Sequence, residues 1–240
     1  MLCAKGQVKT DNLEEFMNGA QIPPIRAFVF DLDGTLIDSK MDLVNSVNAM
    51  LRETGRSQLP ADLIASYVGH GAPQLMASVL GPDSSEEQRR EALAIFMLQY
   101  DEQKLNATRL YPGVFEGLQA LKGLPMAVLS NKPTGMTVQI LEAFGLARFF
   151  GAIYGGDSFP TKKPDPTGVA AVLRELGVLP AESAMVGDSD VDAQTARNAG
   201  MFSINVTYGF GQHDRAAHPA DLYVDTLMEL KSLKPKQAPS

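Results

Sequence analysis

The sequence predicts an α/β protein, a doubly wound parallel sheet with a small α-helical domain inserted into it. Short apolar runs without polar alternation recur along the chain, which is typical of strands buried on both faces of a parallel sheet. Amphipathic helical stretches separate the later runs, and repeated strand–helix–strand units favour right-handed crossovers. A long segment without strand patterns separates the first run from the second, which indicates an inserted domain.

Five apolar runs are the expected strands of the sheet, and small or polar residues close each of them. They are residues 25–30, 125–129, 152–154, 183–186 and 202–206. Helices are expected over residues 134–144 and 167–176, where apolar side chains recur every three or four positions. Gly145 and Gly177 stand where glycine commonly ends a helix.

The inserted domain is expected at residues 41–106 and is predicted to be helical. Its apolar stripes indicate helices at residues 41–51, near residues 75–80 and from Glu86 to about Lys104. Polar residues suited to capping precede the last of these helices.

The rest of the chain divides around this insertion. The predicted parts are the sheet domain at residues 24–40 and 107–234, an N-terminal extension at residues 1–23 with one helical turn near residues 13–17, and a short tail at residues 235–240. The extension carries acidic residues and no continuous apolar segment, so a secretory signal is not expected there.

Composition and charge exclude several classes of protein. Hydrophobic residues make up 45% of the 240 residues and charged residues 20%, which fits a folded globular chain and excludes general disorder. A net charge of −7 and the absence of a basic run argue against a nucleic-acid partner. No run approaches the roughly 20 apolar residues of a membrane helix, and the single Cys3 cannot form an internal disulfide. We therefore expect a cytoplasmic monomer or homodimer without a membrane or nucleic-acid partner.

Polar residues follow the expected strands at the point where each strand ends. Asp31 and Asp33 follow the first strand, and Ser130 follows the second. Lys163 comes after the third strand and Asp188 after the fourth. The C-terminal ends of parallel strands share one edge, so these groups should converge there. Converging carboxylates repel one another unless a cation lies between them, and oxygen ligands favour Mg²⁺.

The same groups suit a phosphoryl group. Gly34 permits a sharp turn after Asp33, and the backbone amides that follow can face an anion. Mg²⁺, a lysine and a serine would neutralise the phosphoryl oxygens. One carboxylate could then attack phosphorus and form an aspartyl phosphate, while the other moves protons.

Four motifs carry a resemblance to a known family. In order, they are FDLDGTL at residues 30–36, SNK at 130–132, KKPDP at 162–166 and GDSDVD at 187–192. They resemble the motifs of the haloacid dehalogenase (HAD) superfamily of phosphotransferases, and the resemblance covers about residues 25–230. It implies a Rossmann-like HAD core with a helical cap. Within the superfamily the chain is most similar to the phosphoglycolate phosphatases, through YVGHG, LYPGV, SNKPT, GGDSFPTKKPDP and TYGFG.

The resemblance implies a role in metal binding and proton transfer for four aspartates. Asp31 would be the nucleophile and a Mg²⁺ ligand. Asp33 would be the general acid/base, with its backbone carbonyl on the metal. Asp188 would be the last protein ligand of Mg²⁺, and Asp192 would accept a hydrogen bond from metal-bound water, outside the ligand sphere.

The resemblance also implies which residues bind the phosphoryl group. Ser130 and Lys163 would contact its oxygens, with Asn131 assisting. Backbone amides at Gly34 and Thr35 would complete the set. The second lysine of the pair, Lys162, would face outward.

The segment Gly69-His70-Gly71 is the candidate substrate contact in the cap. His70 could reach a substrate carboxylate or could be an ordinary polar loop residue, and both interpretations stay open. Gly69 and Gly71 would allow a turn or a close backbone approach.

The function implied is Mg²⁺-dependent hydrolysis of a small phosphorylated metabolite, with 2-phosphoglycolate favoured over other sugar or metabolite phosphates. One alternative is a phosphomutase, which would pass the phosphoryl group of the aspartyl phosphate to a sugar hydroxyl. A non-enzyme alternative is a signalling receiver that is phosphorylated on Asp31. Receivers are much shorter than this chain and lack such an insertion.

Overall fold

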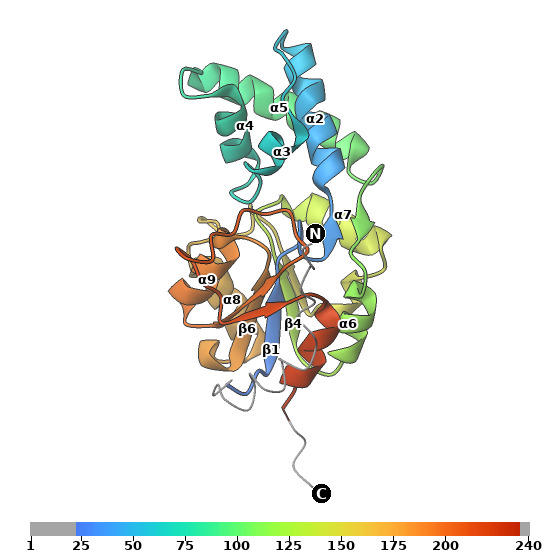
Figure 1. Cartoon of the computed structure of the whole chain (residues 1–240), viewed down its shortest axis with the longest axis vertical. Coiled ribbons are helices and arrows are strands. Elements are labelled where there is room, and N and C mark those ends of the chain that lie inside the picture. Colours follow the sequence, from blue (N-terminus) through green and yellow to red (C-terminus); the bar gives the residue numbers. More distant parts are fainter. Residues whose placement is uncertain (1–22, 236–240) are drawn as a thin grey trace, which may run out of the picture.

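The computed structural model describes residues 23–235 (Figure 1). The helical turn expected near residues 13–17 lies outside the described residues, as do nearly all of the N-terminal extension and most of the tail. The described chain forms a sheet domain flanked by helices, with a group of helices above one end of the sheet (Figure 1).

Six parallel strands form the central sheet in the order β5-β4-β1-β6-β7-β8. Their bounds are β1 Ala27–Phe30, β4 Met126–Leu129, β5 Ala152–Tyr154, β6 Ser183–Gly187, β7 Phe202–Val206 and β8 Leu222–Val224. The predicted parallel α/β fold is confirmed, and each of the five predicted runs matches one strand, with ends that differ by at most two residues. The sequence does not predict β8, because three residues at a sheet edge carry too little pattern.

Helices cover both faces of the sheet because successive side chains of a strand point to opposite faces. Phe28 and Phe30 of β1 pack with α6, α7 and the 3₁₀ helix η3, whereas Val29 packs with α8 and α9. Figure 1 shows α6 and the pair α8 and α9 on opposite sides of β1. The bounds of these helices are α6 Val114–Ala120, α7 Thr134–Ala143, α8 Thr167–Leu176, α9 Asp190–Ala199 and η3 Leu227–Leu233, and two further 3₁₀ turns are η1 Ala147–Phe149 and η2 Pro180–Glu182.

Four helices form the cap, which lies above the carboxyl ends of the strands (Figure 1). They are α2 Lys40–Glu53, α3 Ala61–Ala65, α4 Ala72–Leu80 and α5 Glu86–Gln103. The cap has its own apolar core, in which Met50, Met76 and Phe96 are buried. Ser85 begins α5 through a capping box with Gln88, as the polar residues before this helix predict.

A two-stranded antiparallel ribbon joins the cap to the sheet domain. The strand β2 (Ile37–Asp38) leads into α2, and β3 (Arg109–Leu110) leads back to the sheet. The buried carboxylate of Asp42 accepts hydrogen bonds from the backbone amides of Ala107 and Thr108. These bonds link the chain segment that enters the cap to the one that leaves it. Over residues 23–235, none of the helices combines the length and the apolar character that a membrane span requires.

Candidate active site

A pocket lies between the cap and the edge of the sheet at which β1, β4 and β6 end. It contains about 660 Å³ of space, counting its open mouth. The wall on the sheet side is polar and the wall on the cap side is mostly apolar. Its lining includes Asp31, Asp33, Ser130 and Asp188 from the sheet domain, and Leu75 and Phe96 from the cap.

Asp31 directly follows β1 and lies on the floor of the pocket. The backbone N–H of Asp31 donates to the carbonyl of Val186 at 2.9 Å, which extends the pairing of β1 with β6 by one residue. The carboxylate lies 2.8 Å from Nζ of Lys163. Burial raises the pKa of Asp31 to about 6, although Lys163 opposes the shift. A buried, ion-paired carboxylate that faces a pocket is placed as a nucleophile requires.

The ammonium of Lys163 lies between two carboxylates, 2.8 Å from Asp31 and 2.7 Å from Asp192. Burial by itself would lower the pKa of Lys163, but the two carboxylates raise it above its ordinary value. Asn131 holds the backbone of this lysine, because its side-chain oxygen accepts the N–H of Lys163 and its side-chain nitrogen donates to the carbonyl, each at 3.0 Å. Lys163 is therefore a fixed positive charge beside Asp31.

Asp188 follows β6, and glycines surround its carboxylate. The N–H of Gly211 donates to Oδ2 of Asp188 at 2.6 Å. A Cβ atom on Gly34 would lie 1.9 Å from this oxygen, and one on Gly209 would lie 2.4 Å from it. Only glycine leaves the carboxylate this space. Burial raises the pKa of Asp188 well above its ordinary value, and the charges of Asp192 and Asp31 add to the shift.

The donor set fits a divalent cation. Asp31, Asp188 and Asp192 each offer a carboxylate oxygen, and these oxygens lie within 4.8 Å of one another. The three carboxylates are buried, and the one ammonium among them, that of Lys163, pairs with Asp31 and Asp192 only, so a cation would balance their excess negative charge. Lys163 and Ser189 already donate to the oxygens of Asp192, which leaves Asp31 and Asp188 as the better direct ligands. Carboxylate oxygens are what Mg²⁺ prefers.

The side chain of Asp33 forms an ion pair with a second lysine, Lys132. Nζ of Lys132 lies 2.6 and 2.8 Å from the two carboxylate oxygens, and the hydroxyl of Ser39 donates to the same carboxylate. Lys132 also donates to the hydroxyl of Tyr100, from the cap helix α5, at 2.6 Å. Neither Lys132 nor Tyr100 has a role predicted from the sequence. Lys132 could have been found there, because it ends the motif SNK, whereas Tyr100 lies in the apolar stripe of α5 and resembles an ordinary core residue.

Ser130 and Asn131 follow β4 and play different parts. The hydroxyl oxygen of Ser130 accepts the N–H of Lys132 at 3.2 Å, so its own proton can be donated into the pocket. The side-chain nitrogen of Asn131 donates to the carbonyls of Gly69 and Lys163. The side chain is thus engaged by two loops, and although Asn131 lines the pocket, its contact with the phosphoryl group stays a prediction. Asn131 holds the cap loop and the Lys163 loop together.

Gly34 and Thr35 lie outside the lining of the pocket. The N–H of Gly34 donates to the carbonyl of Ile37 at 2.8 Å, and that of Thr35 donates to Leu32 at 3.3 Å. The turn that Gly34 permits, with a φ of 83°, closes on its own amides. The structure does not support the phosphate contacts expected for these two residues, and Gly34 instead provides the space for Asp188.

His70 is exposed, whereas its neighbours Gly69 and Gly71 line the pocket. Its contact with a substrate stays a prediction. The expectation for Lys162 needs correction. Lys162 is half-buried rather than directed outward, and its Nζ would lie 3.0 Å from a Cβ atom on Gly71. The reason is that the start of the cap helix α4 approaches the loop that carries both lysines.

Comparison with known proteins assigns the chain to a family. The family profile described as haloacid dehalogenase-like hydrolase matches residues 28–206. The chain belongs to this family, and it is an enzyme of the phosphatase class.

The individual relatives are more specific. The chain is 39% identical to a phosphoglycolate phosphatase of Neisseria meningitidis over 233 residues, which cover 92% of this chain and 98% of the relative. It is 37% identical to a phosphoglycolate phosphatase of Nitrosospira multiformis over 222 residues, 90% of this chain and 98% of the relative. Among solved structures, a protein described as a predicted phosphoglycolate phosphatase from Haemophilus somnus superimposes with a TM-score of 0.82 at 32% identity, covering 88% of this chain and 98% of that one.

Proposed function

We propose that the chain is a Mg²⁺-dependent phosphomonoesterase that forms an aspartyl phosphate on Asp31, with 2-phosphoglycolate as the favoured substrate. The observation that carries the proposal is the ion pair of the buried Asp31 with Lys163, next to Asp188, on the floor of the pocket. The names of the Neisseria and Nitrosospira relatives support the choice of substrate.

Mg²⁺ would be held by the carboxylates of Asp31 and Asp188 and by the backbone carbonyl of Asp33. Asp192 would lie outside this set of direct ligands and would act as a hydrogen-bond acceptor. When bound, the ion supplies positive charge beside the phosphoryl oxygens, where negative charge accumulates in the transition state.

In the first step, the carboxylate of Asp31 attacks phosphorus. The new bond between Asp31 and phosphorus forms as the bond to the leaving oxygen breaks, and Asp33 gives its proton to that oxygen. Lys163 neutralises the phosphoryl group from its place 2.8 Å from Asp31, and the hydroxyl of Ser130 donates a hydrogen bond to one phosphoryl oxygen.

In the second step, water hydrolyses the aspartyl phosphate. Asp33, now ionised, takes a proton from the water, whose oxygen attacks phosphorus and displaces the carboxylate of Asp31. The products are inorganic phosphate and the original pair, Asp31 ionised and Asp33 protonated, so the cycle balances. A positioned general base of this kind contributes about 10²- to 10⁴-fold to the rate.

The cap side of the pocket presents apolar residues such as Leu75 and Phe96. A sugar would leave several hydroxyl groups against this apolar wall without hydrogen-bond partners, at a cost in free energy. The lining therefore disfavours a sugar phosphate, and the choice of 2-phosphoglycolate rests on the names of the relatives.

The test is phosphate release from a panel of phosphomonoesters, with Mg²⁺ and with a chelator in its place. We expect inorganic phosphate in stoichiometric yield, the largest kcat/KM for 2-phosphoglycolate, and no turnover with the chelator. The variant Asp31→Asn is the matched blank, since it keeps the size of the side chain and removes the nucleophile. We expect it to lose about 10⁴-fold or more in kcat, with an unchanged far-UV spectrum.

Other outcomes would contradict the proposal in different ways. Consumption of a sugar phosphate without release of phosphate would make the chain a phosphomutase. A phosphorylated protein that persists for minutes without turnover would favour the signalling receiver. An Asp31→Asn variant that keeps a substantial share of the wild-type rate would remove Asp31 as the nucleophile.

A further inference from the structure

One cap side chain is bonded directly to the charged groups of the pocket. The hydroxyl oxygen of Tyr100 accepts a hydrogen bond from Nζ of Lys132 at 2.6 Å, and the same Nζ lies 2.6 and 2.8 Å from the carboxylate oxygens of Asp33. Tyr100 belongs to the cap helix α5, Lys132 follows β4 and Asp33 follows β1. The chain of contacts therefore crosses from the cap to the sheet domain in two steps.

The cap fixes the position of the Tyr100 hydroxyl. Tyr100 is 2% exposed, and its ring stacks on that of Phe96 with centroids 5.7 Å apart. Burial raises the pKa of Tyr100 to about 12, so the phenol stays neutral. The position of this hydroxyl thus follows the position of α5.

Lys132 has no spare hydrogen-bond donor for any other group. An ammonium has three N–H donors, and those of Lys132 are directed to the two oxygens of Asp33 and to Tyr100. Its Nζ also lies 4.6 Å from the centroid of the Tyr100 ring, within the range of a cation–π contact. Removal of the Tyr100 hydroxyl would release one of the three donors and let the ammonium, with the carboxylate bonded to it, change orientation.

A second group from the cap side bonds the same carboxylate. Ser39, the residue before α2, donates its hydroxyl to Asp33. The side chain of Asp33 is thus held between the entry to the cap and, through Lys132, the helix α5. In contrast, the contacts of Lys163 with Asp31 and Asp192 lie wholly within the sheet domain.

We infer that Tyr100 is a positioning residue: through Lys132 it sets the orientation of the Asp33 carboxylate, so that proton transfer to the leaving oxygen depends on the seating of the cap. The inference rests on the proposed acid/base role of Asp33. Phosphoryl transfer to Asp31 and binding of the phosphoryl group do not pass through this chain of contacts.

The test compares two leaving groups with the variant Tyr100→Phe. The alkoxide of 2-phosphoglycolate needs a proton as it leaves, whereas the phenolate of p-nitrophenyl phosphate is a weak base and needs little help. We measure kcat/KM, because it reports the steps up to the loss of the leaving group and excludes the attack of water. We expect Tyr100→Phe to lower kcat/KM about tenfold for 2-phosphoglycolate, a part of the full acid/base contribution, and less than about twofold for p-nitrophenyl phosphate.

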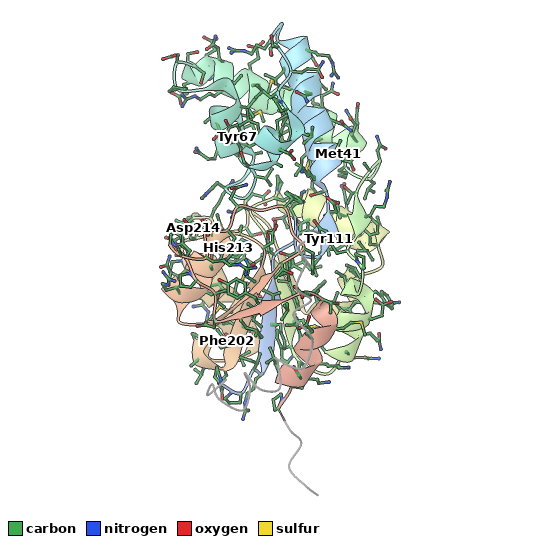
Figure 2. All side chains as sticks on the ribbon, viewed as in Figure 1. Met41, Tyr67, Tyr111, Phe202, His213 and Asp214 are labelled. Atoms are coloured by element: carbon green, nitrogen blue, oxygen red, sulfur yellow. The ribbon has the colours of Figure 1, made fainter. Side chains whose placement is uncertain are left out.

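The control is Tyr67→Phe, the same chemical change at another half-buried tyrosine of the cap, labelled in Figure 2. We expect it to change neither value by more than about twofold. The variant Lys132→Met provides a second test, because it removes the ammonium through which Tyr100 is inferred to act. Because Tyr100 acts through Lys132, adding Tyr100→Phe to Lys132→Met should have almost no further effect on 2-phosphoglycolate, so the two changes are not additive.

The outcomes distinguish a failure of this inference from a failure of the proposed acid role of Asp33. Equal losses for both substrates, or the same tenfold loss in the Lys132→Met background, would overturn the inference, because a structural role of Tyr100 predicts them. The variant Asp33→Asn, measured with the same two substrates, tests the acid role of Asp33 separately from the positioning role of Tyr100. If Asp33→Asn shows the dependence on leaving group and Tyr100→Phe does not, the inference alone fails. If Asp33→Asn shows no such dependence, the acid role of Asp33 fails and the inference fails with it.

Discussion

The sheet domain and the cap present opposite kinds of surface to the pocket that they share. The sheet domain contributes buried charges, with Lys163 between Asp31 and Asp192. The cap contributes apolar side chains and one phenol, that of Tyr100. The charged wall is supported by loops at the ends of strands in one sheet, whereas the cap side reaches the chemistry through Tyr100 and through Ser39 at the entry to the cap. Substitutions in the charged wall should therefore disturb catalysis far more than those in the exposed parts of the cap.

The variant Lys163→Met should have the largest effect. It removes the ammonium between Asp31 and Asp192, and we expect kcat to fall about 10²- to 10³-fold, as for loss of a transition-state donor. The buried carboxylates left without a partner should lower the free energy of unfolding by about 3–5 kcal/mol. Steady-state kinetics and urea unfolding measure the two effects.

The adjacent lysine is the matched control for this variant. Lys162 is half-buried and makes no ion pair in the described part of the chain, so Lys162→Met should change kcat by less than about twofold. Equal losses in kcat for the two variants would mean that the loss does not come specifically from the ammonium between Asp31 and Asp192.

The variant Asp188→Asn should separate metal binding from folding. We expect it to weaken the binding of Mg²⁺ by at least about 100-fold, since losses of 10- to 100-fold follow even from changes outside the direct ligands. Mg²⁺ at 100 times its Kd should stabilise the wild-type chain by about 2.7 kcal/mol, and this gain should disappear in the variant. Thermal unfolding with Mg²⁺ and with a chelator measures it. A variant that Mg²⁺ still stabilises fully would exclude Asp188 as a ligand.

The variant Gly209→Ala tests the space around the same carboxylate. The added Cβ would lie 2.3 Å from Cβ of Asp188 and 2.6 Å from the carbonyl oxygen of Gly34. Asp188 must then move, and we expect about a tenfold loss of Mg²⁺ affinity. Gly135→Ala is the control, because its Cβ would meet no atom within 4 Å and alanine suits a helix better than glycine. Unchanged Mg²⁺ affinity in Gly209→Ala would show that the loop tolerates the shift.

The variant His70→Ala should have the smallest effect. The side chain is exposed and does not line the pocket, so we expect kcat/KM for 2-phosphoglycolate to change by less than about twofold. A rise in KM of more than about twofold would identify His70 as a substrate contact. It would also show that the cap contributes a polar group as well as apolar surface.

Most of the sheet and the charged wall can be predicted from the sequence for one physical reason. Buried parallel strands are continuous apolar runs, and the polar residues that follow them must gather at one edge. Asp31, Lys163 and Asp188 can be placed together in this way from their positions after separate runs. The cap helices are also visible, because their apolar stripes and the capping residues before α5 are local signals.

Only the tertiary structure decides what each polar group contacts. Whether an amide such as that of Gly34 faces the pocket or closes its own turn depends on dihedral angles that several sequences allow. The pairing of Lys132 with Asp33 and Tyr100 joins residues 99 and 32 positions apart, and no local pattern encodes such a distance. The direction of His70 likewise depends on how α4 meets the loop of Lys162. Which groups arrive at the edge of the sheet can be read from the chain, because each follows a buried strand of a parallel sheet. Their partners were decided by the packing of the cap on that edge.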